Sequence, residues 1–244
     1  MTLSCCRQVI VIVASILLFR CDDFGERQGN GAEYPSSEVS TVHHLTSKSA
    51  RERANALSSL QHRVNVSDAE LRALVDSFRY EKVIYLPGPP ATATSASKLL
   101  VKHAPRSTQY LIEGLSAADS NVRRHAAFTL SEIRARSAIS PIRKALGAEL
   151  DRANAALPSA EDPRITLAPF RSMLDAYARI DWHDAVSWTA EQLRGAPSDV
   201  VADVLMMSLI HLAPAGPPCR DRSPTSCASE WERWIREWYH RKML

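Results

Sequence analysis

The sequence predicts an all-α protein built from many short helices. Apolar side chains recur at the i, i+3, i+4 and i+7 spacing that places them on one face of a helix. Residues that typically begin a helix, mainly serine and aspartate, precede several of these stretches. No segment alternates apolar and polar residues as a half-buried strand does. Because 45% of the 244 residues are hydrophobic, the chain can bury a sizeable core.

Residues 1–21 form a leader with the composition of an export signal. Val9 to Phe19 is an apolar run interrupted only by Ser15, and Arg7 precedes it. As a helix, this run covers about half of the ~30 Å hydrocarbon core of a bilayer, which favours a signal over a membrane span. We therefore expect export to the cell envelope or periplasm.

Cys21 ends the leader and is a candidate for lipidation, which would tether the chain to a membrane. Leu18 lies three residues before Cys21, and this spacing resembles the lipobox of bacterial lipoproteins. Phe19 and Arg20 stand where that pattern has small residues. An ordinary secretory signal and an uncleaved leader are the alternatives, since no A-x-A cleavage site is evident.

Residues 22–45 predict a flexible tether. Glycines and a proline are scattered there among polar residues, and no helical apolar period is present. Such a tether would hold a folded domain away from a membrane or form a loose terminus.

Residues 46–214 predict a succession of helices. A helix over Ser47–His62 and a second one that begins at a capping box, Ser67 and Glu70, form a helical hairpin. The prolines of residues 86–90 predict a loop, because proline cannot continue a regular element there. Another helix is expected over Thr94–His103.

Residues 107–157 carry the most specific pattern. A helix that includes Tyr110–Leu115 ends before a turn with Asp119, and Arg123 follows at the start of a second helix rich in alanine. This pattern resembles the short HEAT repeat of phycobilisome-lyase-like proteins, and residues 46–212 resemble it more loosely. The resemblance implies a short α-solenoid of antiparallel HEAT-like helix pairs. It also implies that Arg123 supports the turn by pairing with Asp119.

Helix signals continue towards the C-terminus. Ser140 predicts an N-cap with Pro141 in the first helical position, and a further helix is expected after Pro169. Gly195 predicts the end of the next helix, and Ser198 predicts the cap of the one after it. The intervals between these signals are irregular, so the repeats are degenerate.

Residues 215–228 predict a proline-rich loop that contains Cys219 and Cys227. In an oxidising compartment these two cysteines can close a disulfide. Their spacing differs from C-x-x-C and no second pair accompanies them, so neither a metal site nor a redox dithiol is predicted.

Residues 229–244 predict an amphipathic helix that caps the C-terminal end of the array. Ser229 and Glu232 form a capping-box pattern, and the tryptophans that follow share one helical stripe. Because the end of a solenoid exposes a half-buried face, packing of these tryptophans is favoured over a ligand-stacking role.

Composition and motifs argue against several functions. Without the two leader arginines the net charge is about +1, which disfavours a nucleic-acid binder. No phosphate-binding loop, nucleophile motif or H-E-x-x-H pattern occurs. We therefore predict no catalytic residue, no metal site and no cofactor.

The expected function is that of a noncatalytic exported scaffold or adaptor, because a solenoid groove suits a protein or peptide partner. Arg124, which lies at the start of a helix, and Arg136, which follows close by, are the candidate partner contacts, and a solvated charged face is the alternative. An enzyme or enzyme subunit related to the bilin lyases is the alternative that the resemblance implies. A structural envelope component is the third possibility.

Overall fold

The computed structural model describes residues 37–81, 94–156, 159–160, 163–217, 219 and 223–243. Every regular element in these ranges is helical, which confirms the all-α prediction. The described elements all belong to one unit, Pro35–Leu244. The predicted leader, Cys21 and the loop at residues 86–90 lie outside the described residues. Among the helices that the structure describes, none has the length and apolar character needed to span a bilayer.

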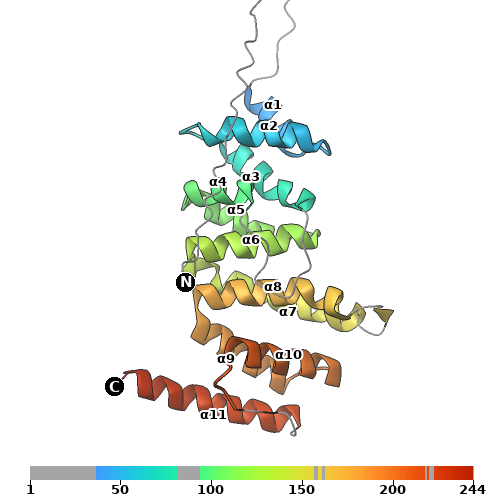
Figure 1. The fold of residues 1–244 in the computed structure, drawn as a ribbon, viewed down its shortest axis with the longest axis vertical. Helices are drawn as coiled ribbons and strands as arrows, with labels where there is room; N and C mark the ends of the chain where they lie inside the picture. The colour runs from blue at the N-terminus through green and yellow to red at the C-terminus, as the bar shows by residue number, and fades with distance from the viewer. Residues whose placement is uncertain are drawn as a thin grey trace, which may run out of the picture. The chain divides into compact units, whose positions relative to one another are not determined.

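Eleven α-helices and two 3-10 helices follow one another along the described chain (Figure 1). In order they are α1 (Ser37–Leu45), α2 (Ala50–Gln61), α3 (Asp68–Ser77), η1 (Phe78–Tyr80), α4 (Ser95–Lys102), α5 (Arg106–Gly114), α6 (Ser120–Ile133), η2 (Arg136–Ala138), α7 (Ile139–Ala156), α8 (Pro163–Ile180), α9 (Trp182–Arg194), α10 (Asp199–Leu212) and α11 (Pro224–Met243).

Several helices begin at the residues that the sequence marks. The Ser67 hydroxyl accepts the amide hydrogen of Glu70 at 3.2 Å, and Glu70 accepts that of Ser67 at 2.9 Å, so the predicted capping box is present. Thr94 caps α4 and Ser198 caps α10 in the same local manner. Gly195 follows the last residue of α9, as predicted.

Part of the predicted tether, residues 22–45, is helical. Residues 37–45 form α1, which packs against α2 and α3. Leu45 is completely buried and Val42 is partly buried against the core. The burial of these apolar side chains outweighs the polar composition that predicted a loose segment.

Three predicted start signals lie inside helices instead. Helix α7 begins at Ile139, so Ser140 is not its cap, and Pro141 falls in the first turn, where a missing amide hydrogen costs no helical bond. Pro169 lies within α8. Ser229 lies within α11, where its hydroxyl donates to the carbonyl of Thr225 at 3.2 Å.

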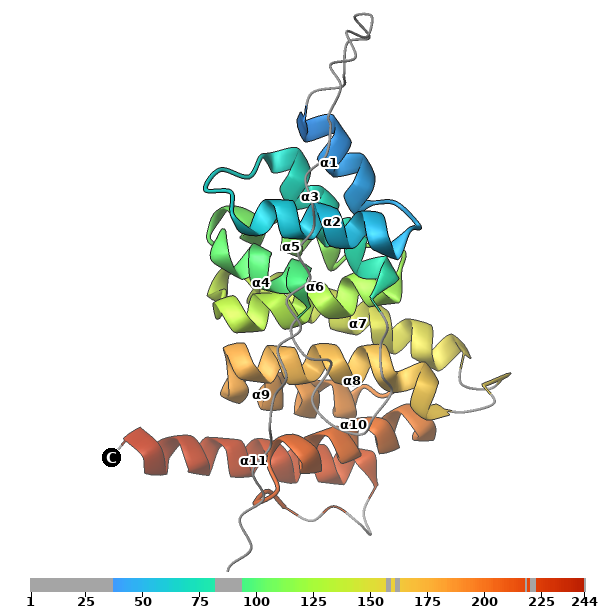
Figure 2. The same ribbon diagram turned by 45° about the horizontal axis from the view of Figure 1, so that its top comes forward.

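Helix α6 is the most deeply buried element. Every residue from Val122 to Ser131 is buried. Helix α6 packs against α3, η1, α4 and α5, which precede it, and very extensively against α8, which follows it. In Figures 1 and 2 it lies between the earlier helices and α7–α11. Polar side chains on α6 must therefore find their partners inside the protein.

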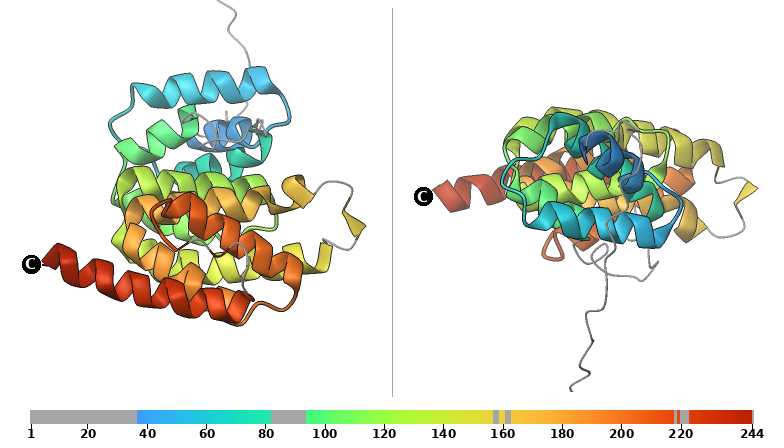
Figure 3. Two further views of the ribbon diagram at one scale, coloured as in Figure 1. Left: turned by 60° about the horizontal axis from the view of Figure 1, so that its bottom comes forward. Right: turned by 90° about the horizontal axis from the view of Figure 1, so that it is seen from above.

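Helix contacts are local in chain order. Among the α-helices, the main contacts join elements no more than three places apart: α1 meets α2 and α3, for example, and α9 meets α8, α10 and α11. Helices α1 and α2 (blue) therefore lie at the opposite edge of the packed helices from α11 (red), as the left view of Figure 3 shows.

Helix α11 is amphipathic and packs against α9 and α10. Among its residues up to 238, whose burial is described, Cys227, Ala228, Trp231 and Ile235 are buried. The exposed side chains of the same stretch are polar: Thr225, Ser226, Ser229, Arg233, Arg236 and Glu237. Helix α11 therefore has an apolar face against the protein and a polar face towards solvent.

Close packing of α5 against its neighbours depends on a glycine. A Cβ at Gly114 would lie 2.8 Å from Cγ1 of Val75 and 3.2 Å from Cβ of Ala126. Val75 is buried and β-branched, so it cannot move aside easily. By contrast, nothing lies within 4 Å of a Cβ at Gly147.

We therefore expect alanine to have opposite effects at these two glycines. Gly114→Ala should lower the free energy of unfolding by about 1–2 kcal/mol through overpacking. Gly147→Ala should raise it by about 0.5–1 kcal/mol, because alanine loses less backbone entropy in a helix. Urea unfolding followed by circular dichroism measures both, and a stabilised Gly114→Ala protein would contradict the close packing.

Candidate functional site

Arg123 of α6 forms its ion pair and hydrogen bonds inside the core. Its side chain is 5% exposed, and its Nε forms an ion pair with Glu149 of α7. Its Nη1 donates to the carbonyl oxygens of Ala117 at 2.7 Å and Ala118 at 2.6 Å. Charge balance from another helix and two backbone acceptors allow a guanidinium to be buried.

The HEAT resemblance implies that Arg123 pairs with Asp119, but Arg123 pairs with Glu149 instead. Asp119 instead caps α6, because its Oδ1 accepts the amide hydrogens of Asn121 at 2.8 Å and Val122 at 3.4 Å. Arg123 still supports the turn, through the carbonyls that precede Asp119. The balancing carboxylate is Glu149, which lies 26 residues away in sequence.

Arg124 was the first candidate for a partner contact, and its burial makes that role untenable. It is only 6% exposed. Its Nε and Nη2 lie 3.3 Å and 3.1 Å from the hydroxyl oxygen of Ser172 on α8. The sequence pattern could not reveal this, because α8 covers Arg124 only after the two helices have packed.

His125 is also buried in the core, at 4% exposure. Its ring stacks on Phe78 with 5.2 Å between the ring centroids. Burial, and secondarily the charge of Arg124, lowers the pKa of His125 to about 4. Among the described residues, none forms a hydrogen bond with its Nε2. Burial therefore favours the neutral imidazole, whose ring packs against Phe78.

A second polar cluster joins α7, α8 and α9, and sequence reasoning missed it. The Nε of Arg143 donates to the hydroxyl of Tyr177 at 2.6 Å, while both side chains also bond to Asp184. Burial, followed by the bond to Asp184, raises the pKa of Tyr177. The phenol therefore keeps its proton, and the cluster locks three helices together. These residues are too far apart in sequence to give a local signal.

Exposed arginines gather at the C-terminal end of α6. Arg134 ends the helix in the left-handed region, at φ 54°, and Arg136 follows in η2; both side chains are exposed. Arg179 of α8 reaches the same end, since its Nη1 lies 3.3 Å from Glu132. Its guanidinium also lies 5.6 Å from the ring centroid of Phe128. We call Arg134, Arg136 and Arg179 the basic patch.

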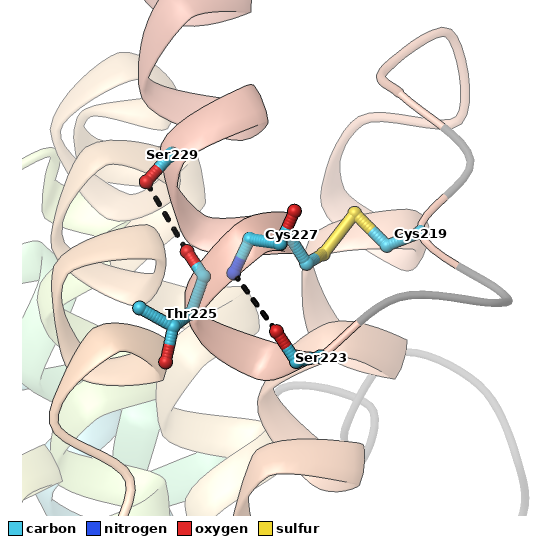
Figure 4. Close-up of a disulfide and its surroundings, with 6 residues drawn as sticks. Cys219, Ser223, Thr225, Cys227 and Ser229 are labelled. Carbon is cyan, nitrogen blue, oxygen red and sulfur yellow. Dashed lines mark hydrogen bonds between the residues drawn. A yellow bond between two sulfur atoms is a disulfide. The ribbon is translucent and has the colours of Figure 1, made fainter.

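Cys219 and Cys227 form a disulfide, as the sequence suggested (Figure 4). Their Cα atoms lie 5.4 Å apart, and both residues are buried. Ser223 lies between them and accepts the amide hydrogen of Cys227 with its carbonyl at 3.0 Å. The disulfide thus ties the preceding loop to the first turn of α11. In the described part of the chain, no group of three or more potential ligand residues is arranged to hold a metal ion.

Comparison with known proteins assigns no family to this fold and these clusters. No protein family, no curated protein and no solved structure matches the chain. The HEAT resemblance of residues 107–157 therefore stays a prediction.

The Arg123–Glu149 pair should be critical for stability. Glu149→Ala leaves the Arg123 charge buried without its carboxylate, and we expect a loss of about 3–5 kcal/mol in the free energy of unfolding. Arg106→Ala breaks an exposed pair with Asp68 and should cost less than about 1 kcal/mol. Chemical denaturation of the two variants gives the comparison. Equal losses in the free energy of unfolding would show that the buried pair stabilises the fold no more than the exposed pair does.

His125 should make the fold sensitive to acid. The unfolded chain binds a proton near the ordinary pKa of 6.5, whereas the folded chain does so only near 4, so acidification in this window favours unfolding. Between about pH 7.5 and about pH 5, this residue should remove about 2 kcal/mol of stability. Denaturation at both pH values should show a smaller loss in His125→Leu. The same pH dependence in both proteins would rule out His125 as the cause.

Proposed function

We propose that the helices form a short α-solenoid of HEAT-like pairs that acts as a noncatalytic, exported scaffold for a protein or peptide partner. The observation that carries this proposal is the local order of the helix contacts. Each helix packs mainly against helices within three places of it in the chain. Such quasi-one-dimensional packing is typical of helical repeat proteins, whose extended surfaces bind other chains.

The chemistry of the buried clusters supports a noncatalytic role. Arg123 and Arg143 have their charges balanced within the protein, and His125 is enclosed in the core. Each of these groups connects helices to one another. Neither arginine therefore needs a substrate to balance its charge.

The basic patch is the proposed contact surface. Arg136 was expected from the sequence to touch a partner, and Arg134 and Arg179 extend the same surface. A guanidinium group offers a planar pair of donors that matches a carboxylate. The partner we propose is therefore a protein segment rich in aspartate or glutamate.

The buried disulfide supports export. Cysteine pairs persist mainly in oxidising compartments outside the cytosol. Cys219 and Cys227 are 2% and 0% exposed, so the bond belongs to the packed core rather than to a reactive surface. Whether the chain is held at a membrane through Cys21 is a separate proposal, which mass spectrometry of the purified protein would test.

A crosslinked pull-down from the envelope fraction tests the scaffold proposal. Arg134→Glu/Arg136→Glu should lose at least about nine-tenths of an acidic partner that the wild type retains, since two attractions become repulsions. The matched control is Arg51→Glu/Lys98→Glu, which makes the same charge change at exposed positions on α2 and α4.

The outcome that contradicts the basic patch is equal loss of the partner in both double variants, because net charge alone would then explain binding. Retention of the partner by both double variants would show that the contact lies elsewhere on the protein. A pigment or small-molecule product in place of a stoichiometric partner would favour the alternative of an enzyme related to the bilin lyases.

A further inference from the structure

Helix α10 carries a stripe of residues that no other described element covers. Val200 and Met207 are 50% and 58% exposed, and they are among the most exposed large apolar residues of the described chain. Asp203 and His211 are exposed as well. At intervals of 3, 4 and 4 residues, these four side chains share one face of the helix. We call them the α10 stripe.

The apolar character of the stripe is unusual for a surface helix. The opposite side of α10 is buried against its neighbours through Val201, Val204, Leu205 and Leu209. Met206 and Ile210 are partly exposed beside the stripe. Helix α10 is thus apolar on most of its circumference, and a helix of this kind normally has a partner on each apolar side.

The acidic residue and the histidine of the stripe indicate what that partner is. Asp203 and His211 lie four residues before and four residues after Met207. If two α10 helices cross antiparallel at Met207, Asp203 of each lies opposite His211 of the partner subunit. A stripe with an acid and a base at equal distances from an apolar centre is complementary to itself, which is the requirement of a two-fold interface.

The existing contacts of His211 are compatible with this arrangement. Its Nε2 lies 3.3 Å from Oδ1 of Asp175 on α8, within the same subunit. In the protonated imidazole both ring nitrogens are donors, so Nδ1 can then donate to a carboxylate from another chain. His211 would then bridge two carboxylates, one from its own subunit and one from the partner subunit.

We propose that the α10 stripe is the contact surface of a homodimer, in which two copies of this chain pack α10 against α10 around a two-fold axis at Met207. The stripe and its flanking residues form a small interface, at the low end of the range for specific contacts, so association is weak. A dimer carries two copies of the basic patch, and the dimer contact itself does not involve that patch.

Site-specific photo-crosslinking on the full chain tests the arrangement directly. With p-benzoylphenylalanine in place of Met207, ultraviolet light should produce a covalent dimer in which position 207 is joined to α10 of the second copy. The matched control has the same group in place of Val64, which is 86% exposed between α2 and α3, and it should yield no dimer.

Sedimentation of the unlabelled protein provides the second measurement. Met207→Arg should weaken dimerisation by at least about ten-fold, because two like charges would meet at the axis. An unchanged circular dichroism melting curve would show that this variant still folds. Loss of the partner in Arg134→Glu/Arg136→Glu should leave the dimer intact, which separates this test from that of the scaffold function.

Three results would overturn the proposal. One is a protein that stays monomeric up to about 1 mM, the concentration at which a dimer with a dissociation constant of about 1 mM is half formed. Another is a photo-crosslink from position 207 to residues 1–36 of the chain, since the leader would then occupy the stripe. The third is a crosslink to any element of a second copy other than α10.

Discussion

The burial of α6 is the constraint on which the rest of the structure depends. On a helix that is covered on all sides, a charged group without a partner would oppose folding through its desolvation. Arg123 is therefore tied to Glu149 of α7 and Arg124 to Ser172 of α8, while the ring of His125 stacks on Phe78 of η1. Through these contacts a single helix connects the elements before it with those after it.

The buried polar groups join helices to one another, whereas other polar groups are exposed on the surface. The Arg143–Tyr177–Asp184 cluster repeats the principle farther along, where hydrogen bonds and charge hold α7, α8 and α9 in place. The two surfaces that we propose as contacts are exposed to solvent. The basic patch offers guanidinium groups, and the α10 stripe offers apolar area between an acid and a base.

Near the C-terminus, one face of the helices is covered by α11 and another is exposed. Helix α11 covers α9 and α10 with Trp231 and Ile235 and turns polar residues to solvent. Trp231 also packs against Gly216, where a Cβ would overlap its ring, so the loop before the disulfide lies directly on the indole. Together the tryptophan and the disulfide hold α11 in place, while the α10 stripe remains exposed.

By itself the sequence determined the features that depend on neighbours a few residues apart. The Ser67–Glu70 capping box, the Ser198 cap and the helical apolar stripes belong to this class, because each is satisfied within one turn of the chain. The choice of Glu149 for Arg123, the burial of Arg124 and the Tyr177 cluster were decided only by tertiary structure. Their partners lie 26 to 48 residues away, and no local pattern records which helices will pack side by side. Packing also overrode local signals, since burial of Leu45 extends helix formation into the expected tether and α11 begins before Ser229.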